Sequence, residues 1–225
     1  MWSLFIETTD TGVLKNLDLH YYLNNTSAVN NYSGMLGSNY GTISNIMITL
    51  EEATEVPNIN LSLLARNNYG TIENFVIHSK ASLSTSFGSS LLVKHNAGII
   101  KNGYAYGEAI NATYTSGDDR ARKEVAVFAS MSDGGSTISN VYNLIPINVT
   151  SSPTAGDGEK LVGDIVGWAI RATITNAYSS AEGENRLKDN DPNVGDRSGA
   201  VSFKNYIITL KTYIVIQIIL KRYLN

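Results

Sequence analysis

The stretch Gly70-Thr71-Ile72-Glu73-Asn74 recurs along the chain at a nearly constant distance, and this recurrence decides the fold. Its other copies lie at residues 12–16, 41–45, 98–102, 136–140 and 172–176, with a degenerate seventh copy at 202–205. The last residue of each copy is an asparagine: Asn16, Asn45, Asn74, Asn102, Asn140, Asn176 and Asn205. The intervals between these asparagines are 29, 29, 28, 38, 36 and 29 residues. A period of this length is typical of a repeat protein.

Each repeat has the pattern of two or three short strands joined by turns. In the third copy, the apolar pair Leu63-Leu64 is followed by the polar turn 66–69, and apolar residues resume after the asparagine at Phe75 and Ile77. The two long intervals contain the polar stretches 115–123 and 151–160, which we interpret as inserted loops. Units built only from strands stack on one another to complete a core. We therefore predict an all-β fold for residues 1–205, a parallel β-helix (β-solenoid) of about seven coils.

The alternation of side chains in a strand predicts the role of the repeated asparagine. The Ile two residues before each asparagine has the same parity, so we expect both to face inward. The apolar residues after the asparagine have the opposite parity, so the backbone must turn at that residue, and asparagine tolerates the left-handed conformation. Stacked coils would place successive amides roughly 4.8 Å apart. We therefore expect a structural ladder of hydrogen-bonded amides formed by Asn16, Asn45, Asn74, Asn102, Asn140 and Asn176.

The composition excludes several classes of protein. Of the 225 residues, 17 are basic and 20 acidic, and this net charge of −3 argues against a nucleic-acid-binding protein. Cysteine is absent, which excludes a disulfide scaffold and a thiolate metal site. The residues after Met1 show neither a basic region nor a long apolar core, so we expect no signal peptide. No uncharged apolar run reaches 18 residues, so we expect no membrane span. We also expect a monomer.

A column of tyrosines is the strongest candidate for a binding surface. Tyr104, Tyr142 and Tyr178 each stand two residues after a repeated asparagine, so parity places them outward and in register on successive coils. Exposed aromatic patches can mark binding surfaces, whereas stacked tyrosines also stabilise the face of a sheet. Both interpretations remain open from the sequence.

The extended repeats resemble one family. Residues 14–19, 100–108 and above all Asn67-Asn68-Tyr69-Gly70-Thr71-Ile72-Glu73-Asn74-Phe75-Val76-Ile77-His78-Ser79-Lys80-Ala81 are similar to the N-terminal repeat region of streptococcal zinc metallopeptidases of the immunoglobulin A protease type. The resemblance covers about residues 4–205. It implies a large Gram-positive parent enzyme, secreted or at the cell surface, whose zinc-containing protease domain would lie far C-terminal to this region. We expect a host protein or a glycan as the partner of the chain.

The chain lacks the residues that would make it the catalytic part of such an enzyme. The zinc-protease motif is His-Glu-x-x-His on a helix, and none of His20, His78 and His95 begins one. We therefore expect no catalytic residue, no bound metal and no cofactor in this chain. The stretch Asp189-Asn190-Asp191-Pro192-Asn193-Val194-Gly195 alternates oxygen ligands, but glycine stands seventh and Ala200 twelfth, unlike an EF-hand loop. The acids at 118, 119 and 157 are isolated and form no column like the paired carboxylates of glycosidases.

Two classes of function follow from these observations. The first is a non-catalytic recognition or spacer module of a secreted metalloendopeptidase. The second is an adhesin-like or polysaccharide-binding surface solenoid with no enzyme attached. The gene downstream discriminates them, because only the first requires an encoded His-Glu-x-x-His motif.

The composition changes abruptly after Asn205. Residues 206–225 contain no Gly, Asp or Glu, and are rich in Ile, Leu, Tyr and Lys. A solenoid usually ends in a polar cap, so this apolar tail predicts a reading-frame shift near Lys204 that truncates a longer protein. Deleting residues 206–225 should raise solubility, because uncharged β-prone segments drive aggregation. Moving the DNA frame near codon 204 should restore Gly- and Asn-rich sequence. Immediate stop codons in the shifted frames, with unchanged solubility, would show that the tail belongs to the fold.

Overall fold

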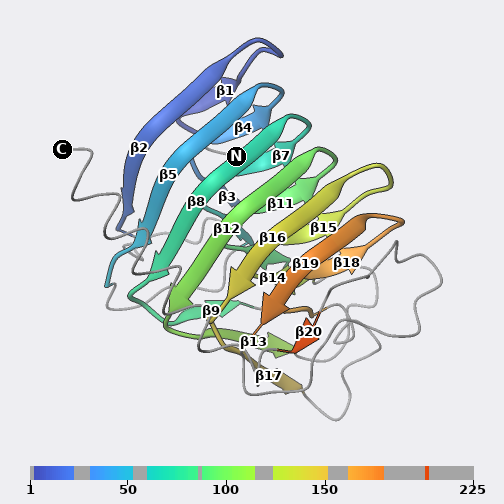
Figure 1. Ribbon diagram of the computed structural model, residues 1–225. Coiled ribbons are helices and arrows are strands. Elements are labelled where there is room, and N and C mark those ends of the chain that lie inside the picture. Colours follow the sequence, from blue (N-terminus) through green and yellow to red (C-terminus); the bar gives the residue numbers. More distant parts are fainter. Residues whose placement is uncertain are drawn as a thin grey trace, which may run out of the picture.

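The chain folds as a parallel β-helix, as the repeats predict. The computed structural model describes residues 3–22, 31–52, 60–85, 88–114, 124–151, 162–179 and 201–202, and the tail 206–225 and the stretch 189–195 lie outside these residues. Strands are the only regular elements in the described part, and every strand pair is parallel. Figure 1 shows the coils stacked in chain order along one axis.

The broadest face of the solenoid is a seven-stranded sheet that we call the broad sheet. Its strands, in spatial and chain order, are β2 (Val13–Tyr21), β5 (Thr42–Leu50), β8 (Thr71–Ser79), β12 (Ile99–Gly107), β16 (Thr137–Asn143), β19 (Thr173–Ser179) and β20 (Val201–Ser202). Six of these strands contain a repeated asparagine, and β20 lies beside the sixth of them. The seventh strand departs from the repeat. In the structure, Ser202 lies opposite Ser179. The repeat would align Asn205 with Asn176, and this would place Ser202 opposite Thr173.

Shorter strands form the remaining faces. One sheet contains β1 (Phe5–Glu7), β4 (Leu36–Asn39), β7 (Ala65–Asn68), β11 (Val93–Asn96), β15 (Ala129–Ser132) and β18 (Val166–Ala169). A three-stranded sheet contains β9 (Leu83–Thr85), β13 (Ile110–Tyr114) and β17 (Ile147–Ser151). The two remaining pairs are β3 (Asn31–Ser33) with β6 (Asn60–Ser62), and β10 (Ser89–Ser90) with β14 (Val125–Ala126).

The core consists of columns of apolar side chains, one from each coil. The repeated isoleucine forms the most regular column, and its five members are all 0% exposed: Ile43, Ile72, Ile100, Ile138 and Ile174. A neighbouring column combines large and small residues: Leu17, Ile46, Phe75, Gly103, Val141 and Ala177. The ring of Phe75 occupies the space where a side chain on Gly103 would lie, since a Cβ built there would approach the ring to 2.0 Å. Because the Phe75 ring fills this space, the core stays densely packed although this strand has a glycine in its interior.

The repeated glycine lies where the chain enters the broad sheet. A Cβ built on Gly70 would lie 2.1 Å from the carbonyl oxygen of Gly41, and one on Gly98 would lie 2.2 Å from that of Gly70. The coils therefore approach too closely at this turn for any side chain. Ser136 and Ala172 replace the glycine in later coils, where the turn is one or two residues longer. The longer turn explains how these coils accommodate a side chain.

The predicted asparagine ladder is present in the broad sheet. All six asparagines have the left-handed backbone conformation, with φ between 50° and 59°. Each side-chain nitrogen donates to the side-chain oxygen of the preceding coil, over 3.1 to 3.3 Å, in the pairs Asn45–Asn16, Asn74–Asn45, Asn102–Asn74, Asn140–Asn102 and Asn176–Asn140. The expectation that these side chains face inward is wrong. The left-handed conformation turns them to the surface, where their hydrogen bonds are exposed.

A second asparagine ladder lies inside the solenoid, at the end of the short strands. Asn39, Asn68 and Asn96 are all 0% exposed. The side-chain nitrogen of Asn39 donates to Asn68 over 2.8 Å, and that of Asn68 donates to Asn96 over 2.8 Å. Asn96 then donates to the hydroxyl of Ser132 over 3.1 Å. These donors point toward the following coil, opposite to the surface ladder, so the two columns of amide dipoles are antiparallel.

The two ladders predict different effects of mutation. Asn68→Ala should lower the free energy of unfolding by about 2 kcal/mol or more, because it leaves buried groups of Asn39 and Asn96 without their ladder partners. Asn74→Leu should cost about 1–2 kcal/mol, because leucine is strained in the left-handed conformation. Asn74→Gly should cost less than either, since glycine adopts that conformation freely. Urea unfolding followed by circular dichroism measures these differences.

Glu73→Ala is the control for this series. Glu73 lies beside Asn74 and makes one ion pair with Lys101 (3.0 Å), so its loss should stay within about 0.5 kcal/mol. If Asn68→Ala and Asn74→Gly lowered the free energy of unfolding equally, the buried ladder would not contribute more to stability than the surface ladder.

Candidate functional site on the broad sheet

The outward side of the broad sheet brings the three predicted tyrosines into one column. Tyr104 pairs with Tyr142, and Tyr142 pairs with Tyr178, in the register of β12, β16 and β19. All three side chains are half-buried. Their column begins with Asp18, Met47 and Val76 on the earlier coils. The tyrosines of this column are therefore confined to the later coils.

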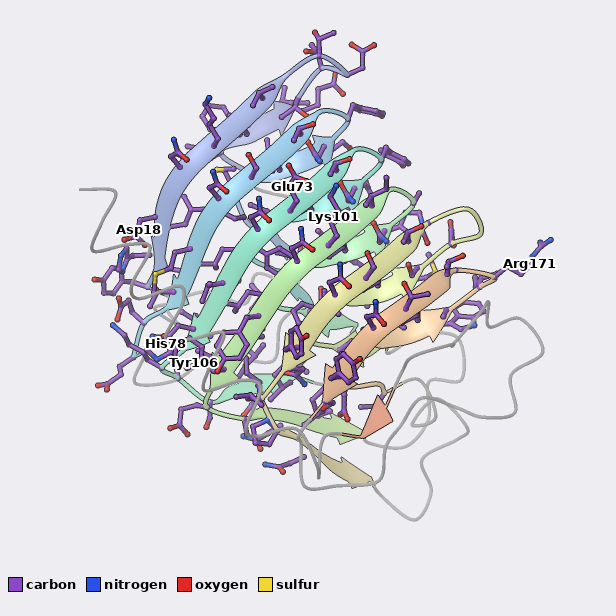
Figure 2. The ribbon with its side chains drawn as sticks, viewed as in Figure 1. Asp18, Glu73, His78, Lys101, Tyr106 and Arg171 are labelled. Atoms are coloured by element: carbon purple, nitrogen blue, oxygen red, sulfur yellow. The ribbon has the colours of Figure 1, made fainter. Side chains whose placement is uncertain are left out.

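Two further rings extend this group, and together with the three tyrosines we call them the aromatic strip. Tyr106 lies two residues after Tyr104 on the same face, and it is in register with His78 of β8. The His78 and Tyr106 rings stack with centroids 4.3 Å apart, and the Tyr106 and Tyr104 rings stack at 5.3 Å. Figure 2 shows His78 and Tyr106 side by side toward the carboxyl end of their strands.

The remaining two rings form a stack of their own. The Tyr142 and Tyr178 centroids lie 5.2 Å apart, with an angle of 19° between the ring planes. His78 and Tyr106 could have been found from the sequence, because each stands four residues after a repeated asparagine and so shares the parity of the tyrosine column. The sequence does not show on which neighbouring ring each tyrosine stacks. Tyr104 stacks along its own strand on Tyr106, although Tyr142 is its neighbour in register.

The stacking determines what the strip can offer a ligand. Parallel rings bury their faces against one another, so they present mainly ring edges and hydroxyl groups outward. Ring edges carry partial positive charge, and tyrosine hydroxyls both donate and accept hydrogen bonds. Burial, with a smaller contribution from Tyr106, raises the pKa of the Tyr104 hydroxyl, so this hydroxyl stays protonated at neutral pH. The strip therefore suits a partner with hydrogen-bonding groups at regular spacing.

A charged cluster borders the strip on the first coils. Glu51 accepts hydrogen bonds from His20 Nδ1 (2.6 Å) and from Lys80 Nζ (2.7 Å). His20 Nε2 lies 3.2 Å from Asp18. The bond to Lys80 and then the bond to His20 hold the pKa of Glu51 below its usual value. The bond to Glu51 is the largest cause of the raised pKa of His20.

A second aromatic group lies outside the broad sheet, at the turns that follow the short strands. Tyr40 and Tyr69 stack at 4.9 Å and are each 44% exposed. The edge of His95 approaches Tyr69 at 6.4 Å, and His95 Nε2 lies 2.7 Å from Asp133. This pair of tyrosines stacks in a geometry similar to that of Tyr104 and Tyr106 but at a separate position, which makes it a matched control.

The three histidines are thus distributed over different partners. His20 binds Glu51, His78 stacks on Tyr106 and His95 binds Asp133. Within the described ranges, no three side chains of His, Cys, Asp or Glu gather where they could hold a metal ion. The same ranges contain no helix long and apolar enough to cross a membrane. The calcium-like stretch and the isolated acids at 118, 119 and 157 lie outside the described residues.

Comparison with protein-family models, with curated proteins and with solved structures gave no match to this chain. The fold and the site themselves define the structural class of the chain, which is a parallel β-helix with an aromatic strip on its broad sheet. The resemblance to the repeat region of the zinc metallopeptidases rests on the quoted residues alone.

The pKa values of His78 in the strip and of His20 in the charged cluster should shift in opposite directions. Burial, followed by the charge of Lys80, lowers the pKa of His78, whereas Glu51 raises that of His20. His20 therefore contributes stability that is present at low pH and lost as the pH rises through its raised pKa. The lowered pKa of His78 makes the folded state less stable as the pH falls, because the unfolded chain takes up the proton more readily. Proton NMR titration of the imidazole C–H signals, assigned with His20→Gln and His78→Gln, measures both values. A higher pKa for His78 than for His20 would contradict the described environments.

Proposed function

We propose that this chain is a non-catalytic recognition module, in which the aromatic strip binds a macromolecular partner. The module belongs to a secreted or cell-surface zinc metalloendopeptidase of the immunoglobulin A protease type, which it serves by recognising the substrate or by spacing the protease domain. The resemblance of residues 67–81 to the repeat region of that family supports the parent enzyme. The zinc and the catalytic residues belong to the parent's protease domain and not to this chain.

The aromatic strip is the observation that carries the recognition role. Five rings from four adjacent strands lie on one outward face, held in position by the parallel register of the sheet. Tyrosine supplies contact area with few rotatable bonds, so little conformational entropy is lost when it binds a partner. A site on paired strands is also held more rigidly than a site on loops. Both properties favour recognition of an extended partner.

A polysaccharide is the second candidate partner. The outward hydroxyls of the strip could bind sugar hydroxyl groups at the coil spacing, roughly 4.8 Å. The geometry of the rings opposes this candidate, because sugars usually pack on exposed ring faces, and the strip buries ring faces against one another. A protein partner can use ring edges and hydroxyls directly. We therefore place a host protein, immunoglobulin A by the resemblance, before a glycan.

Binding of the purified chain to immobilised immunoglobulin A tests this proposal. The double variant Tyr104→Ser with Tyr106→Ser should weaken binding about thirtyfold, since aromatic residues at the centre of an interface contribute at least about 2 kcal/mol. The matched control is Tyr40→Ser with Tyr69→Ser, which removes a stacked pair at a separate position and should leave the affinity unchanged.

The same surface can then be offered a panel of linear polysaccharides. Binding to a polysaccharide but not to the immunoglobulin, with loss in the strip variant, would support the second candidate. Equal losses in the strip variant and in the control would contradict the strip as the binding site. Absence of binding to either class of partner would contradict the recognition role.

A further inference from the structure

One end of the solenoid is an open apolar surface. In the first coil, Leu4, Phe5 and Ile6 are 75%, 51% and 84% exposed, and Val13 is 60% exposed. Leu14, Leu17, Leu19 and Tyr21 of β2 pack against the core but are only partly buried. Among the described residues, β1 and β2 each have a partner strand on one side only. This end therefore combines an apolar surface with a free strand edge, which favours association.

The opposite end of the described coils exposes little of its apolar core. Ala172, Ile174 and Ala177 of the sixth coil occupy the same columns as residues of the first, yet each is at most 1% exposed. Stacking of one molecule on another in the head-to-tail sense would need exposed apolar surface at both ends. The unequal ends favour a contact between two copies of the first coil, which is a symmetric, isologous contact.

The first coil also ends the buried ladder, through Thr8. Thr8 stands where the next three coils have asparagine, and its hydroxyl donates to the side-chain oxygen of Asn39 (2.8 Å). The same hydroxyl accepts the backbone N–H groups of Tyr40 (2.9 Å) and Gly41 (3.1 Å). Thr8 thus completes the buried ladder without a further coil. A second copy can therefore cover the open surface without leaving the buried ladder incomplete.

The free edge of β2 is complementary to itself. If Leu17–Tyr21 pairs antiparallel with the same segment of a second copy, centred on Leu19, then Leu17 lies opposite Tyr21 on the core side. On the outward side, Asp18 lies opposite His20 and His20 opposite Asp18. Side chains directly opposite in an antiparallel pair are about 5 Å apart, so each Asp18 stabilises the protonated form of the opposite His20. Other centres within this segment place unlike faces together or leave fewer pairs.

We propose that the chain forms a symmetric dimer through its first coil, with antiparallel pairing of the two β2 edges around Leu19. The contact would extend the broad sheet across the twofold axis and bury the partly exposed leucines of both copies. It differs from the monomer expected from the sequence, because the repeat pattern alone does not show which coil leaves its core columns exposed. The surface lies on earlier coils than the aromatic strip, so this inference does not depend on the proposed function.

Sedimentation equilibrium of the full chain over a wide concentration range tests the dimer. Asp18→Lys should weaken dimerisation about tenfold or more, because it places lysine opposite His20 at two symmetric positions. The side chain of Asp18 is 64% exposed, so this change should not impair folding, which circular dichroism checks. Adding His20→Asp to Asp18→Lys should restore dimerisation, because lysine then lies opposite aspartate. Glu108→Lys makes the same change of charge at an exposed position outside β2 and should have no effect.

Three outcomes would overturn the proposal. The first is a monomer at every concentration. The second is an equal effect of Asp18→Lys and Glu108→Lys, which would reflect net charge and not edge pairing. The third is failure of the added His20→Asp to recover dimerisation in a chain that remains folded, which would exclude the proposed register.

Discussion

Asparagine in the left-handed conformation is the constraint on which the shape of each coil depends. A nine-residue strand with simple alternation would turn either the repeated Ile or the apolar residues after the asparagine to solvent. One residue with φ near 55° reverses the alternation, so that Ile72 and Phe75, for example, are both buried. Asparagine adopts this conformation more readily than most residues, and its amide then joins the next coil. The same residue type thus bends each strand and fixes the register between strands.

The buried ladder adds a second constraint of a different kind. Its amides are removed from water, so each must find a partner, and the register that supplies Asn68 with Asn39 and Asn96 is strongly preferred over its neighbours. The surface ladder can lose a bond to water at little cost. Hydrophobic columns alone tolerate sliding between similar side chains, whereas a buried amide column does not. We infer that the surface ladder shapes the coils and that the buried ladder aligns them.

The repeat made the fold and the surface ladder predictable, since a fixed interval and side-chain parity are both properties of the sequence. The outward position of the ladder was not predictable, because parity assumes an unbroken strand and the left-handed residue breaks it. The buried ladder is harder to predict: Asn39, Asn68 and Asn96 also recur at 29 and 28 residues, but an asparagine in a turn needs no further explanation in a sequence. The tyrosine column followed from parity, but the stacking of Tyr104 on Tyr106 depends on side-chain rotamers. The displaced seventh strand shows where the repeat stops controlling the register.

The exchange of side-chain amide protons measured by NMR tests the central claim most directly, namely that a buried asparagine ladder holds the coils in register. The structure predicts slow exchange for the side-chain N–H groups of Asn39 and Asn68, which are 0% exposed and hydrogen-bonded at 2.8 Å. It predicts fast exchange for Asn45 and Asn74, whose bonds are exposed. Exchange of Asn39 and Asn68 as fast as that of Asn45 and Asn74 in the folded chain would contradict the account.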